Sequence, residues 1–139
     1  MSYLIDSNVI SELRKRDRAD AAVRRWFEGV DDAELFLSVL TLGEIRRGIE
    51  SIQRRDRVRA LALNRWLHAL AAGYEARILT VDQKVADEWG RLNASSTVPV
   101  IDGLLAATAR VHGLTLVTRN TRDVARTGVS FLNPFIPTA

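Results

Sequence analysis

The sequence predicts an α/β fold built around a mainly parallel sheet. Short apolar segments that suit strands alternate along the chain with longer segments in which apolar residues recur at helical spacing. This alternation is typical of units in which a helix crosses from one parallel strand to the next. The 139 residues suffice for one compact domain and are too few for two. No repeat or linker divides the chain, so we expect one domain over residues 1–139.

The expected strands are short and rich in apolar or β-branched residues. They lie at 3–5, 35–38, 77–79, 114–118 and about 129–131. Helical spacing predicts helices between them, at 9–13 and at about 19–29, 41–52, 55–72, 80–92 and 100–112. Thr41 with Glu44, and Thr80 with Gln83, have the capping-box pattern of a helix start, and Gly113 suits a helix end.

The composition excludes several classes of protein. Cysteine is absent, which rules out disulfides and thiolate metal sites. No apolar run approaches the roughly 20 residues needed to span a bilayer. The first residues lack the basic region and the small-residue cleavage site of a secretory signal. We therefore expect a cytoplasmic protein with no membrane partner.

Positive charge is concentrated in the first half of the chain. Of the 20 basic residues 18 are arginine, and the stretch 44–65 holds seven of them against three acids. Guanidinium groups match the geometry of phosphate. A solvated helix face explains this pattern by itself, so the charge supports a nucleic-acid partner without establishing one.

Four acidic residues fall where a parallel sheet places its chemistry. Asp6 directly follows the first strand, Asp123 lies in the loop leaving the strand 114–118, and Glu44 and Asp102 stand in first turns of helices. Ligands bind outside the carboxyl ends of such strands. Crowded carboxylates suit Mg²⁺ or Mn²⁺, which can activate water and stabilise charge on a phosphodiester. Spacing alone predicts a candidate divalent-metal site. Helix capping, the helix dipole and turn formation remain alternatives for the last three acids.

Four segments resemble, in order, the motifs of PIN-domain proteins. They are 4–12 around Asp6, 38–48 around Glu44, 101–109 around Asp102, and 116–123 with the closing 128–135. The last is similar to the VapC and FitB-like branch, the toxins of VapBC-type toxin–antitoxin pairs. The resemblance implies a three-layer α/β/α fold with a central, mainly parallel sheet of four to five short strands.

The resemblance also implies a metal-dependent endoribonuclease that hydrolyses RNA through metal-activated water and leaves a 5′-phosphate and a 3′-hydroxyl. The implied catalytic acids and metal ligands are Asp6, Glu44, Asp102 and Asp123, with Mg²⁺ or Mn²⁺ as cofactor. Some relatives have an acid where this chain has Asn120. Whether Asn120 or Asp123 is the fourth ligand therefore stays open.

Other polar residues are assigned supporting roles by the same resemblance. Ser7 and Thr118 would orient bound water or a carboxylate. Contact with the RNA backbone is expected of Arg14, Arg16, Arg46 and Arg47, with helix capping or plain exposure to solvent as the alternative.

The implied partners are a homodimer mate and a cognate VapB-like antitoxin, which lays a segment into a groove of the toxin and covers the acids. Trp26, Phe27, Trp66 and Leu67 could line that groove, with a place in the core as the alternative. Two other functions are alternatives: a non-catalytic PIN-like module that binds RNA or protein, and a phosphatase or flap-type nuclease. Asn8, where an aspartyl-phosphate enzyme would have a second acid, and the short chain count against the latter pair.

Overall fold

The computed structural model describes residues 1–95 and 97–137 and contains a parallel five-stranded sheet. Its strand order is β3-β2-β1-β4-β5, and every neighbouring pair is parallel. The strands are β1 (Tyr3–Ile5), β2 (Leu35–Ser38), β3 (Ile78–Leu79), β4 (Thr115–Val117) and β5 (Phe131–Leu132). The predicted α/β class and parallel sheet are confirmed.

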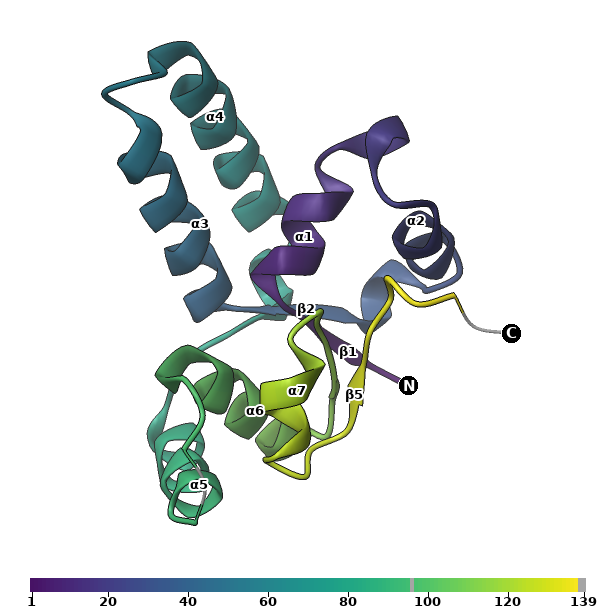
Figure 1. Ribbon diagram of the computed structural model, residues 1–139, viewed down its shortest axis with the longest axis vertical. Helices are drawn as coiled ribbons and strands as arrows, with labels where there is room; N and C mark the ends of the chain where they lie inside the picture. Colours follow the sequence, from purple (N-terminus) through teal and green to yellow (C-terminus); the bar gives the residue numbers. More distant parts are fainter. Residues whose placement is uncertain (96, 138–139) are drawn as a thin grey trace.

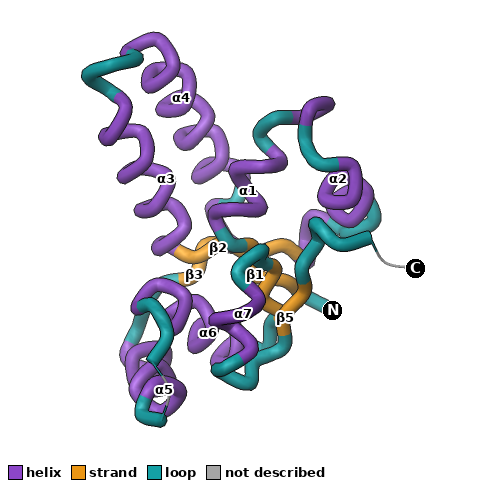
Figure 2. Tube along the Cα trace, viewed as in Figure 1, coloured by secondary structure: helices purple, strands orange, loops and turns teal. Residues whose placement is uncertain are grey.

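Helices cover both faces of this sheet, which gives the expected three layers (Figures 1 and 2). Those in the described residues are α1 (Ser7–Leu13), α2 (Ala21–Glu28), α3 (Val39–Ile52), α4 (Arg57–Gly73), α5 (Gln83–Asn93), α6 (Val100–His112) and α7 (Thr121–Ala125). The first four lie on one side and α5 to α7 on the other, while α3 and α4 form a hairpin that projects from the sheet. No helix of the described residues is long and apolar enough to cross a membrane.

Two apolar clusters hold the layers together, one on each face of the sheet. In β1 and β4, Leu4 and Leu116 are paired in register and belong to the cluster beneath α6. Ile5 and Val117, the next register pair, belong to the cluster beneath α1 to α4. Side chains of a strand alternate between faces, so one short strand supplies both cores. All four side chains are fully buried.

Several predicted helix boundaries were wrong. Ser38, not Thr41, caps α3 through a hydrogen bond from the Leu40 amide, so Glu44 stands in the second turn rather than the first. Thr41 is buried inside the helix, and its hydroxyl has no hydrogen-bond partner in the described residues. The cap of α5 is likewise Asp82, which accepts from the Val85 amide. In both cases a residue other than the threonine of the proposed box lies at the point where the chain turns into the helix.

Two further expectations differ in placement. Asp123 lies in the first turn of α7 and not in a loop. Val58 and Leu61, which keep helical spacing with the core residues of α4, are 83% and 53% exposed. They lie on the projecting hairpin, where no other layer covers them. Gly113 ends α6 as predicted, with a left-handed φ of 68°.

Candidate active site

The acids gather at the point where the strand order reverses. The chain runs from β1 to β2 and β3 on one side, then adds β4 and β5 on the other. Asp6 directly follows β1, and Thr118 directly follows the neighbouring strand β4. The Asp6 backbone amide donates to the Val117 carbonyl at 2.9 Å. Open parallel sheets bind their ligands at such a switch point.

Asp6 is 3% exposed and is held by donors from its own chain. Its Oδ1 accepts from the Ser7 amide at 2.7 Å, and its Oδ2 accepts from the Thr118 hydroxyl at 2.7 Å. The Asn8 side-chain amide donates to Oδ2 at 3.3 Å. A buried carboxylate is tolerated only when it is hydrogen-bonded in this way. The position of Asp6 is therefore fixed by residues from both central strand ends.

Ser7 links the first acid to the second. Its hydroxyl donates to Glu44 Oε1 at 3.0 Å and lies 3.4 Å from Asp6 Oδ1. Burial raises the pKa of Glu44; the bond from Ser7 opposes this shift, and the negative charges of Asp6 and Asp102 add to it.

Asp102, in the first turn of α6, completes the group with Asp123. Burial raises the pKa of Asp102, and the charges of Asp6 and Asp123 raise it further, while the Asn120 side chain partly offsets the shift. The backbone amide of Asn120 donates to the Thr118 hydroxyl at 3.0 Å, which anchors the residue beside the site. The structure thus brings together all four predicted acids, with Asn120 and Asp123 both beside Asp102.

The donor set fits a hard divalent cation. No three acidic or histidine side chains among residues 1–95 and 97–137 already form a metal-binding group. The acids nevertheless repel one another in a partly desolvated place, and a cation would relieve that repulsion. Carboxylate and amide oxygens are the ligands that Mg²⁺ and Mn²⁺ prefer. The residues that would hold the ion are Asp6, Glu44, Asp102 and Asp123, with Asn120 as a neutral oxygen.

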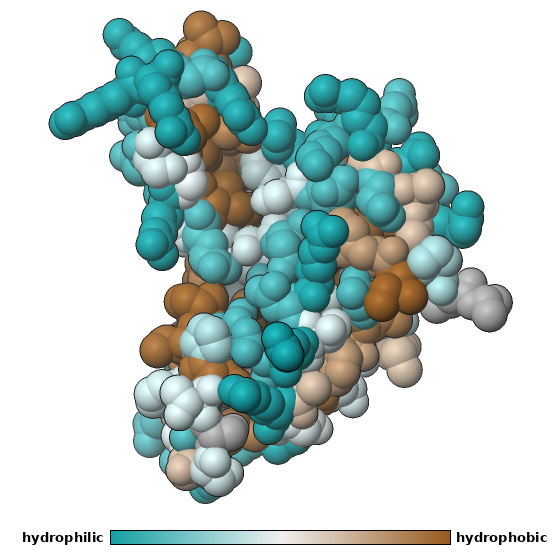
Figure 3. Space-filling model, in the orientation of Figure 1, coloured by the Kyte–Doolittle hydropathy of each residue, from teal (hydrophilic) through white to brown (hydrophobic). Residues whose placement is uncertain are grey.

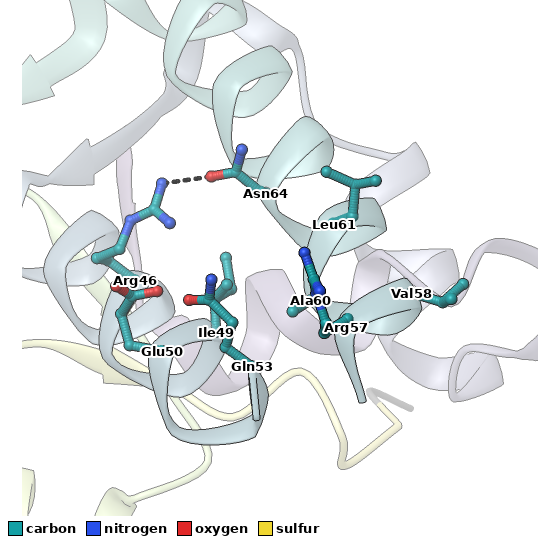
Figure 4. Close-up of a pocket in the computed structure, with 9 residues that line it drawn as sticks. All are labelled: Arg46, Ile49, Glu50, Gln53, Arg57, Val58, Ala60, Leu61 and Asn64. Carbon is teal, nitrogen blue, oxygen red and sulfur yellow. Dashed lines mark hydrogen bonds between the residues drawn. The ribbon is translucent and has the colours of Figure 1, made fainter. Parts of the chain in front are cut away.

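The four candidate arginines have different surroundings. Arg14 lines a groove together with Ser7 and Glu44, and the charge of Arg47 lowers the pKa of Glu44. Arg46 instead donates to Asn64 Oδ1 at 2.6 Å across the space between α3 and α4 (Figure 4). Arg16 is exposed beyond the end of α1, with a positive φ of 54°.

The apolar candidates are divided between the core and the surface. Trp26 and Phe27 pack against the cluster beneath α1 to α4, and Leu67 is buried within it. Of the four, only Trp66 lines the groove beside Glu44. Leu67 is therefore a core residue and does not line the groove. Trp26 and Phe27 make their main contacts with the core as well.

Asn8 belongs to this site but was not among the predicted site residues. Besides its bond to Asp6, its side-chain oxygen accepts from the Arg119 amide at 3.2 Å, and its amide lies 3.4 Å from the Thr118 hydroxyl. It thereby ties the corner after β1 to the corner after β4. The available signal was an asparagine two residues after a strand-ending acid, at a helix start.

Comparison with known proteins places the chain in a family. Residues 3–129 match the PIN-domain model. The VapC ribonuclease Y4jK of Sinorhizobium fredii is 31% identical over 96% of this chain and 98% of its own. Toxin FitB of Neisseria gonorrhoeae is 28% identical over 95% of this chain and 97% of its own. The crystal structure of FitAcB from the same organism has a TM-score of 0.85, at 28% identity, and covers 96% of this chain and 98% of that one. The chain belongs to the PIN-domain family, in its VapC and FitB-like branch.

Proposed function

We propose that the protein is a metal-dependent endoribonuclease and the toxin of a VapBC-type toxin–antitoxin pair. The observation that carries the proposal is the cluster of four carboxylates at the switch point of the sheet, around the fixed Asp6, in which neighbouring negative charge raises the pKa of Glu44 and Asp102. The names of the relatives, a VapC ribonuclease and a FitB toxin, support the reaction class. With RNA as substrate, the expected place of action is the cytoplasm.

Different residues of the chain position the acids of the site. Asp6 is held by Ser7, Asn8 and Thr118, and one hydrogen bond from the Ser7 hydroxyl links Glu44 to this fixed acid. Asp102 and Asp123 approach from helices on the opposite face of the sheet. A bound Mg²⁺ or Mn²⁺ would supply an activated water and stabilise charge on the phosphodiester, with products that carry a 5′-phosphate and a 3′-hydroxyl.

The proposed partners are a VapB-like antitoxin and a second copy of the toxin. A solved relative, at 26% identity and a TM-score of 0.75, is described as FitAB bound to a DNA fragment. We expect co-expression with the cognate antitoxin to yield a stable complex without nuclease activity, measured by size-exclusion chromatography with light scattering.

The decisive experiment compares RNA cleavage by the purified protein with Mg²⁺, Mn²⁺ or EDTA. Asp6→Asn is expected to abolish cleavage, because it removes a negative charge from the centre of the cluster. Asp87→Asn is the matched control, since Asp87 lies on α5 and pairs only with the exposed Arg91 in the described residues. Cleavage at the parent rate by Asp6→Asn would refute the site. Metal-independent RNA binding without any cleavage would favour the non-catalytic module.

A further inference from the structure

We propose that the groove between α1 and the α3–α4 hairpin holds a single-stranded segment of the RNA next to the cleavage site, an inference that rests on the proposed function. The groove has a volume of about 430 Å³, and Ser7 and Glu44 line it. Figure 3 shows this side of the molecule hollowed between the hairpin and α1. An RNA strand bound in this groove would therefore lead directly to the acidic site.

The charge of the groove favours a polyanion. Arg14, Arg55 and Arg59 line it, and Glu44 is the acid among its lining residues. An adjoining cleft is lined only by basic side chains, those of Arg14, Lys15, Arg18 and Arg59. Arg55 and Arg59 are exposed, and neither forms a salt bridge within the described part of the chain. Every phosphate of a strand carries one charge, so such a row of cations suits a nucleic-acid backbone.

The floor of the groove is apolar, which distinguishes a single strand from a duplex. Ile45 and Ile49 form its buried part, and the half-buried Trp66 lies beside them. The Arg14 guanidinium lies over the Trp66 ring, 5.9 Å from its centroid. Unpaired bases stack on aromatic rings and guanidinium planes, whereas a duplex keeps its bases stacked inside and offers mainly phosphates and hydroxyls.

The two sides of α3 face different grooves, and only one of these grooves is lined by residues of the acidic site. Arg46, Arg57 and Asn64 line a separate groove of about 420 Å³ between α3 and α4, together with Val58 and Leu61 (Figure 4). Neither Ser7 nor any of the four acids belongs to that lining. The RNA path therefore uses Arg55 and Arg59 and leaves out Arg46.

The test replaces both exposed arginines of the RNA groove, as Arg55→Ala with Arg59→Ala. The matched control is Arg54→Ala with Arg57→Ala, which removes the same charge from the same turn and helix start outside that groove. Each pair is placed in the parent and in Asp6→Asn. Binding of a fluorescent oligouridylate of about 12 nucleotides, and of a duplex of equal length, is measured by anisotropy in Asp6→Asn over a range of salt.

We expect the groove pair to weaken single-strand binding about tenfold and to lower the salt slope by about 1.4, since each lost phosphate contact on a single strand removes about 0.7. In the parent, KM for RNA should rise with little change in kcat, while the control pair changes neither. Equal losses in both pairs, unchanged single-strand binding, or preference for the duplex would overturn the inference. So would loss of antitoxin binding alone, which would make the groove a protein-docking surface. Because binding is measured without cleavage, failure of the nuclease proposal would leave this result readable.

Discussion

Replacing Thr118 by valine tests whether the buried Asp6 carboxylate depends on one hydroxyl. Thr118 is fully buried, donates to Asp6 Oδ2 at 2.7 Å and accepts from the Asn120 amide at 3.0 Å. Valine keeps the branched shape but can make neither bond. A hydrogen bond to a charged group contributes about 1.5–3 kcal/mol and a neutral one about 1 kcal/mol. We therefore expect Thr118→Val to lower the free energy of unfolding by about 2–4 kcal/mol.

The measurement is urea denaturation in EDTA, so that no metal contributes to stability. Thr108→Val is the matched control, because Thr108 is also fully buried and its hydroxyl makes one neutral bond, to the Leu104 carbonyl at 2.7 Å. That change should destabilise by about 1 kcal/mol. Thr118→Ser should recover most of the lost stability and of the kcat for RNA cleavage. If Thr118→Val destabilised the protein no more than Thr108→Val, the hydroxyl would not be holding a charged Asp6.

Each of three further predictions concerns one residue of the interior or of the site. Asp102→Asn should stabilise the metal-free protein at neutral pH, because the raised pKa of Asp102 means that its charged form disfavours folding. This gain in the free energy of unfolding should vanish as pH falls below 3.8, the ordinary pKa of an aspartate. Urea titrations that find the parent more stable than Asp102→Asn near pH 7 would contradict this reasoning. Gly103→Ala should destabilise by about 1–3 kcal/mol in thermal unfolding, since its Cβ would lie 3.1 Å from the Trp89 ring and 2.8 Å from Asn93 Nδ2, which is held by a hydrogen bond to the Trp89 carbonyl. Gly90→Ala meets nothing within 4 Å and should not destabilise. Thr41→Val should raise the free energy of unfolding by about 1 kcal/mol, because the buried hydroxyl has no partner among the described residues; a loss of stability would point to one.

The sequence predicted the elements whose signals are local. The strands at 3–5 and 35–38 agree with β1 and β2, and Gly113 ends α6 in the left-handed conformation that glycine favours. The starts of α3 and α5 were misplaced because several capping residues stand close together, at Ser38 and Thr41 for α3. Which one caps depends on where the preceding strand leaves the sheet, and that is set by tertiary structure.

Burial along α4 shows a second limit of sequence patterns. Val58 continues the apolar spacing of the helix, yet it is exposed because the hairpin extends beyond the layers that bury Leu67. Periodicity identifies the apolar face of a helix but not whether anything covers it.

The convergence of the site depended on strand order, which no single segment carries. Asp6 and Glu44 meet because β2 lies beside β1, and Asp6 meets Thr118 because β4 lies on the other side of β1. Asn8 was missed for the same reason, since its backbone partner Arg119 lies 111 residues along the chain. The ordered motifs that resemble PIN domains supplied the assignment that spacing alone left open.

The acids of the site differ in how well the chain itself stabilises their carboxylates. Asp6 receives short hydrogen bonds from the Ser7 amide and the Thr118 hydroxyl, so the chain itself holds this buried carboxylate in place. Glu44 and Asp102 are half-buried, and burial and neighbouring charge raise the pKa of both. These two acids therefore have the most to gain from a bound cation. A divalent ion would relieve their repulsion while Asp6 stays where the chain holds it, which would make Asp6 the fixed reference of the site and Glu44 and Asp102 the groups that adjust on binding.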